Sequence, residues 1–176
     1  MTFDLTLSGS DLLLLAPEIF LTIWLCVVLV IDFSIKNIDH ENLAYLSFGG
    51  ILATLVNLIW FDYVGVHGSL FKNMFVLDGV AIFFKIIVLL ATALVLLSSI
   101  DYVKTFRFFR GEYYFLVMMS ALGMMFMASA QDLLSVFVTL EFSTFGFYVL
   151  VAYLREDARS SEAGLKFFIL GVVAAG

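Results

Sequence analysis

Five long runs of apolar residues constrain this chain of 176 residues more than any other feature of its sequence. A helix that crosses the hydrocarbon core of a bilayer needs about 20 residues that are mostly apolar, and each run is long enough. The runs are Leu12–Ile31, Leu43–Phe61, Phe75–Ile100, Tyr113–Ala130 and Leu133–Leu154. The sequence therefore predicts five transmembrane helices.

The composition agrees with this prediction, because 63% of the residues are apolar and only 14% are charged. A soluble domain carries about 25% charged residues, so an ordinary soluble enzyme is excluded, as is a disordered chain. The single cysteine, Cys26, excludes a disulfide scaffold. The two histidines, His40 and His67, fall in separate polar loops without a Cys or acidic cluster at metal-ligand spacing, and the chain has no Gly-rich phosphate loop. We expect an all-α, polytopic transmembrane bundle that binds no cofactor, metal or nucleic acid itself.

The two ends of the chain carry further expectations. The residues before the first run include two Asp and no basic residue, so we expect a retained helix rather than a signal peptide. Pro17 is expected in the first turn of that helix or at a kink. A sixth run, Leu165–Ala175, rises only ~16 Å, about half the hydrocarbon thickness. We expect an incomplete sixth span and a chain that is the front part of a longer protein.

The basic residues predict an orientation. Three alternate connections hold six of them, and the opposite side holds only Lys72. The six are Lys36, Lys104, Arg107, Arg110, Arg155 and Arg159. Connections rich in Lys and Arg stay in the cytoplasm. We therefore expect a multi-pass protein of the cell inner (plasma) membrane, with its N-terminus on the outer (periplasmic) side.

Glu141 is the first candidate functional residue. It lies near the middle of the fifth run, with eight uncharged residues before it and thirteen after it. A charge at the centre of a membrane helix costs about 2.5–3.5 kcal/mol on insertion scales, so such residues usually face the bundle interior and serve a function. From its position alone, Glu141 is either a group that takes up and releases a proton or a member of a permanent ion pair.

Two lysines are further candidates. Lys166 opens the sixth run four residues after Glu162, so the two share one helix face, and Lys166 is either part of a local ion pair at the membrane edge or a functional residue. Lys85 lies ten residues into the third run, too deep to reach the headgroups easily. It is either paired between helices, which we favour, or part of a proton relay, and Asp78 is a candidate partner on a similar face. Small residues are expected to let helices approach closely at Gly49, Gly50 and Gly123.

Several short stretches carry a family signature. They are Pro17–Ile19, Leu77–Gly79, Gly111–Leu116, Leu122–Ala130, Leu140–Glu141, Tyr148–Leu150 and Arg159–Gly171. Together they resemble subunit N of the proton-pumping NADH:quinone oxidoreductase (respiratory complex I), one of its antiporter-like membrane subunits. The segment Arg159–Lys166, which reads Arg-Ser-Ser-Glu-Ala-Gly-Leu-Lys, is the most specific part. The likeness is looser at residues 142–146, where the family is richer in Leu and often has Pro.

The resemblance implies a subunit of fourteen helices, with three N-terminal helices before two inverted repeats of five. Residues 1–110 would form the three N-terminal helices, and residues 111–176 would begin the first repeat with helices four to six. Glu141 matches the family's fifth-helix glutamate, which works with a lysine beyond this chain. Lys166 matches a sixth-helix lysine near the same hydrophilic axis. Both are the implied sites of proton transfer driven by quinone reduction.

The resemblance also implies what lies outside the chain. FMN, iron–sulfur clusters and quinone would belong to the parent complex, and the chain alone would be inactive. Its partners would be other membrane-arm subunits and the lipid bilayer, with quinone acting only indirectly. Two alternatives remain: a subunit of a cation/proton antiporter or membrane-bound hydrogenase, or a purely structural membrane bundle in which Glu141 is merely ion-paired. Substituting Glu141 by Gln separates the last alternative from a proton relay.

Overall fold

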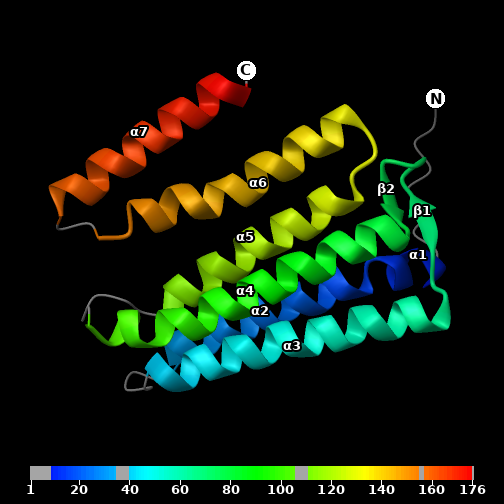
Figure 1. The fold of residues 1–176 in the computed structure, drawn as a ribbon, viewed down its shortest axis with the longest axis horizontal. Coiled ribbons are helices and arrows are strands. Elements are labelled where there is room, and N and C mark those ends of the chain that lie inside the picture. Colours follow the sequence, from blue (N-terminus) through cyan, green and yellow to red (C-terminus); the bar gives the residue numbers. More distant parts are fainter. Residues whose placement is uncertain (1–8, 35–39, 106–110, 155–156, 176) are drawn as a thin grey trace.

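The computed structural model describes residues 9–34, 40–105, 111–154 and 157–175. Within these ranges the chain forms helices and one small two-stranded sheet (Figure 1). The helices are α1 (Gly9–Leu14), α2 (Ala16–Ser34), α3 (His40–Val64), α4 (Gly79–Thr105), α5 (Gly111–Ser129), α6 (Leu133–Val151) and α7 (Ala158–Ala175), and the strands are β1 (Gly68–Leu70) and β2 (Phe75–Leu77). The prediction of a helical bundle is confirmed.

Helices α2 to α6 are each long and apolar enough to cross a membrane, which confirms the five predicted spans. The chain is a multi-pass membrane protein. The spans alternate in direction: α2, α4 and α6 end at the left of Figure 1, where α3, α5 and α7 begin. The helix ends that flank the three connections expected to be basic therefore lie at one end of the bundle. Lys36, Arg107, Arg110 and Arg155 themselves lie outside the described residues.

The first span begins later than predicted. The sequence placed its start at Leu12, but α1 ends at Leu14 and α2 begins at Ala16. Pro17 lies in the first turn of α2, which is one of its two predicted places, and is buried. Proline cannot donate a backbone hydrogen bond and disfavours the α conformation in the residue before it, so the helix restarts here.

Helix α7 is longer than the apolar run that predicted it. The apolar run forms its second half, and a polar first half extends it to 18 residues. At a rise of 1.5 Å per residue α7 is about 27 Å long. Arg159, Glu162 and Lys166 lie on it, and α7 is not among the five helices apolar enough to count as spans. It packs against α6, to which it runs antiparallel (Figure 1).

A β-hairpin joins α3 to α4, where the apolar run predicted that the third helix starts at Phe75. That start is wrong, because residues 75–77 form β2, which pairs antiparallel with β1. The hairpin turn contains Phe71, Lys72 and Asn73, all with positive φ. Helix α4 begins only after Asp78, whose Oδ1 accepts a hydrogen bond from Ala81 N at 2.8 Å and so caps the helix.

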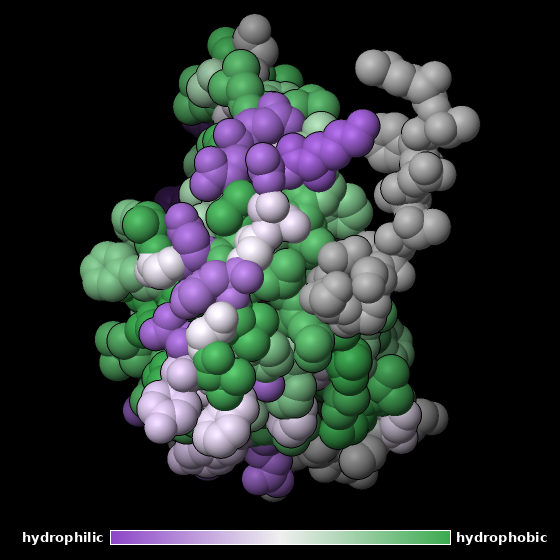
Figure 2. Space-filling view, turned by 90° about the vertical axis from the view of Figure 1, so that its right-hand side faces the viewer, coloured by the Kyte–Doolittle hydropathy of each residue, from purple (hydrophilic) through white to green (hydrophobic). Residues whose placement is uncertain are grey.

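Figure 2 looks onto the end of the molecule that carries the hairpin. Hydrophilic residues gather across this end, and hydrophobic residues cover the flanks (Figure 2). Exposed polar residues near the end of α3 and on the hairpin include Asp62, His67, Lys72 and Asn73. This distribution is the one expected where a bundle leaves the hydrocarbon and meets the polar headgroups.

The core lies between α2, α3, α4 and α5, and α6 packs on the outside of α5. The close approach of α5 and α6 requires Gly123, because a Cβ atom there would lie 2.7 Å from the backbone of Ser143. A Cβ atom at Gly50 would overlap the Trp24 ring, so close packing is confirmed at both glycines. The expectation is wrong for Gly49, which has open space beside it.

Candidate functional site

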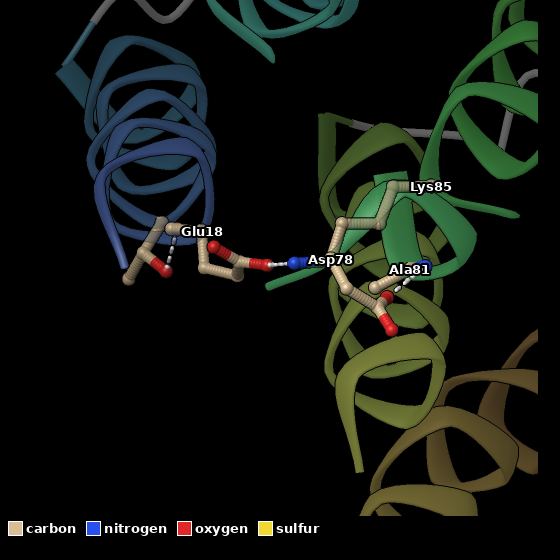
Figure 3. A network of polar contacts seen from close by, with 5 residues as sticks. Glu18, Asp78, Ala81 and Lys85 are labelled. Atoms are coloured by element: carbon tan, nitrogen blue, oxygen red, sulfur yellow. Dashed lines mark hydrogen bonds and ion pairs between the residues drawn. The ribbon is translucent and has the colours of Figure 1, made fainter. Parts of the chain in front are cut away.

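A buried ion pair joins α2 to α4 near the hairpin end of the bundle. Lys85 Nζ lies 2.5 Å from Glu18 Oε1, and the two side chains are 0% and 1% exposed (Figure 3). The interpretation of Lys85 as a lysine paired between helices is confirmed. The choice of Asp78 as its partner is wrong, because the Asp78 carboxylate caps the start of α4 instead.

The position of each residue in its helix explains why they meet. Helical side chains lean toward the N-terminus of their helix, so the long Lys85 side chain reaches back toward the start of α4. Glu18 lies in the first turn of α2, where the helix dipole favours a negative charge. Because α2 and α4 begin at the same end of the bundle, the carboxylate and the ammonium lie at a similar depth (Figure 1).

The pair is shielded by aromatic and apolar groups. Lys85 Nζ lies 4.9 Å from the centroid of the Phe75 ring, within the range of a cation–π interaction. Glu18 Oε2 accepts no hydrogen bond from the described residues. Removing one partner of such a pair leaves an uncompensated buried charge, which costs about 3–5 kcal/mol. The arrangement suits a fixed connection between α2 and α4.

Glu141 lies halfway along α6 and is half-buried. Among the described residues no basic side chain forms an ion pair with its carboxylate. Its backbone carbonyl accepts a hydrogen bond from Thr144 Oγ1 at 3.2 Å. Within the described part of the chain, the permanent ion pair considered for Glu141 is therefore not formed.

Lys166 lies halfway along α7. Its Nζ is 2.5 Å from Glu162 Oε1, which confirms the local pair predicted from their spacing. The side chains are 69% and 64% exposed on the described chain, so neither is shielded. Glu141 and Lys166 are not ion-paired, but each lies at the middle of its helix, and α6 and α7 are neighbours. Because Phe167 and Phe168 contact Tyr148, seven residues after Glu141, Lys166 lies nearer the α6–α7 connection than Glu141 does.

Glu18 was not predicted as a functional residue, although it lies in Pro17–Ile19, one of the stretches that resemble the family. A usable signal was present, since a lysine too deep to reach water requires an anion at the same depth. Among the described residues no three His, Cys, Asp or Glu side chains are grouped so that they could hold a metal ion. The expected absence of a cofactor stays a prediction.

Similarity to known proteins shows which class of membrane protein this chain belongs to. A family profile described as "NADH:quinone oxidoreductase/Mrp antiporter, TM" matches residues 130–176. A chain in the structure of respiratory complex I from Thermus thermophilus with bound aureothin superposes with a TM-score of 0.71 at 25% identity, over 90% of this chain and 34% of that one. The fold and these matches are those of an antiporter-like membrane subunit.

Curated relatives make the assignment more specific. NADH-quinone oxidoreductase subunit N of Heliobacterium modesticaldum is 43% identical over 77% of this chain and 28% of its own length. Subunit N of Dehalococcoides mccartyi is 41% identical over 92% of this chain and 33% of its own length. The chain is therefore homologous to subunit N of NADH-quinone oxidoreductase, as the sequence resemblance predicted. It spans about a third of the length of these relatives.

Proposed function

We propose that this chain is part of a proton-translocating membrane-arm subunit of NADH:quinone oxidoreductase, in which quinone reduction elsewhere in the complex drives proton movement through Glu141 and Lys166. The observation that carries the proposal is the position of Glu141, half-buried at the middle of a membrane helix and without an ion pair among the described residues. Keeping a carboxylate there is costly, so a functional role is favoured over a structural one.

The proposed mechanism is coupled titration. A carboxylate in a low-dielectric site releases its proton when a cation approaches and takes one up when the cation withdraws. Lys166 lies on the adjacent helix α7, so movement of its ammonium away from Glu162 and toward Glu141 changes the potential at Glu141. A lysine from the remainder of the subunit, implied by the family resemblance, would be the direct partner of Glu141.

The proposal includes a location and partners. The basic connections predict that the end of the bundle where α3, α5 and α7 begin faces the cytoplasm, with the hairpin end on the outer side of the plasma membrane. Other membrane-arm subunits are the proposed partners, supported by the similarity to a chain of a whole respiratory complex. The matching family profile also covers Mrp antiporters, but the curated relatives named above favour the oxidoreductase.

The test is Glu141→Gln in the full-length subunit within the assembled complex in inverted membrane vesicles. Glutamine keeps the shape of the side chain and removes its ability to carry a proton. We expect assembly at the unsubstituted level and a fall in proton pumping of about tenfold or more, measured with a pH-sensitive dye during NADH oxidation. Quinone turnover should fall with it, because the two steps are coupled.

The matched control is Glu41→Gln, the same substitution at an exposed residue in the first turn of α3. It should leave both assembly and pumping unchanged. Unchanged proton yield and turnover in an assembled Glu141→Gln complex would show that Glu141 is not part of the proton path.

A further inference from the structure

We propose that Glu18, Lys85 and Phe75 form a positioning unit that holds the start of α6 in place and thereby sets the location of Glu141. The unit connects the buried ion pair to the α5–α6 turn through the hairpin. Its effect on α6 is independent of the proposed function, and its effect on pumping rests on that function.

The first step is the contact between the ion pair and the hairpin. Glu18 fixes the Lys85 ammonium at 2.5 Å, and the ammonium lies 4.9 Å from the Phe75 ring centroid. All three side chains are buried, with Phe75 only 7% exposed. A cation–π contact is strongest where water is excluded, so the ammonium holds the ring and, with it, strand β2.

The second step is the contact between the hairpin and the α5–α6 turn. Phe75 forms a β-bridge with Ala130, and Met74 O accepts a hydrogen bond from Gln131 N at 3.1 Å. The Phe75 ring also meets Phe126 of α5 edge-on, with 6.3 Å between centroids. One residue therefore contacts the ion pair with its ring and the turn with its backbone.

The third step leads from the turn to Glu141. Asp132 follows Gln131 directly and caps α6, its carboxylate accepting a hydrogen bond from Leu134 N at 2.9 Å. Because α6 is one continuous hydrogen-bonded helix from Leu133 to Val151, a displacement of its first turn displaces the residues that follow. Glu141 lies nine residues after Asp132, about 13.5 Å along the helix. The hairpin contact thus fixes the depth and rotation of Glu141.

The test is Phe75→Leu in the full-length subunit of the assembled complex. Leucine keeps an apolar side chain on β2 but eliminates the aromatic ring that contacts the Lys85 ammonium. We expect faster hydrogen exchange in the peptide containing Gln131, and a fall of several-fold in protons pumped per electron. Phe75→Tyr keeps the ring and should restore both values. Phe71→Leu is the matched control, the same change in the same hairpin at a side chain 43% exposed, and should alter neither.

The double variant Glu18→Gln/Lys85→Met provides a second test, because it removes the ammonium and leaves Phe75 in place. Exchange at Gln131 should rise here as well. Unchanged exchange in either variant, relative to Phe71→Leu, overturns the positioning unit. If exchange rises but Glu141→Gln pumps normally, the proposed function fails while the positioning of α6 stands.

Discussion

Two ion pairs with the same Nζ–Oε1 distance of 2.5 Å lie in very different surroundings. Glu18 and Lys85 come from different helices and are fully buried, whereas Glu162 and Lys166 lie one turn apart on α7 and are mostly exposed. Coulomb energy depends on the local dielectric as much as on distance, and exposed pairs contribute little. The buried pair therefore suits a permanent structural contact, and the exposed lysine can change its partner at low cost.

The largest effect is expected from breaking the buried pair. Lys85→Met leaves the Glu18 carboxylate uncompensated and should destabilise the bundle by about 3–5 kcal/mol. We expect a severe loss of assembled complex, measured by native gel electrophoresis of detergent-solubilised membranes. The double variant Glu18→Gln/Lys85→Met removes both charges and should recover most of the assembly. Equal losses in the single and double variants would contradict a pair that acts mainly by mutual neutralisation.

An intermediate effect is expected from separating α5 and α6, the helices that lie between the buried pair and the exposed pair. Gly123→Val puts a branched side chain where even a Cβ atom would lie 2.7 Å from the Ser143 backbone. Forcing α5 and α6 apart should cost about 1–3 kcal/mol and lower the melting temperature of the purified complex. Gly49→Val is the matched control, because Gly49 has open space beside it. Similar melting temperatures for the two variants would contradict the close packing of α5 on α6.

The smallest effect is expected from the exposed pair. Glu162→Gln removes a pair along one helix, which contributes about 0.2–0.5 kcal/mol. Assembly and melting temperature should stay at the unsubstituted level when measured beside Lys85→Met. A loss of assembly as large as that of Lys85→Met would show that the α7 pair is buried in the full complex and would remove the contrast between the two sites.

Much of the fold could be predicted from the sequence because a membrane span is a local property. Each of the five runs needs only its own apolar length, and such a run predicts a helix whatever it packs against. The start of α4 could not be predicted in the same way. Phe75–Leu77 is as apolar as the helix that follows, so hydropathy alone does not distinguish a short strand from a first helical turn.

The residues of the candidate site also differ in whether local sequence or tertiary packing determines their partners. The sequence by itself placed Glu141 at the middle of its helix and Lys166 on one helix face with Glu162, since helix depth and a spacing of four residues are local. It placed Lys166 at the start of the sixth run, whereas the structure places it at the middle of α7. Only the tertiary structure decided that Lys85 pairs with Glu18 rather than with Asp78. The reason is physical: Asp78 precedes the helix that carries Lys85, and its carboxylate already accepts a hydrogen bond from the backbone N–H of Ala81. Glu18 lies on another helix and reaches the ammonium only through the tertiary arrangement of α2 and α4.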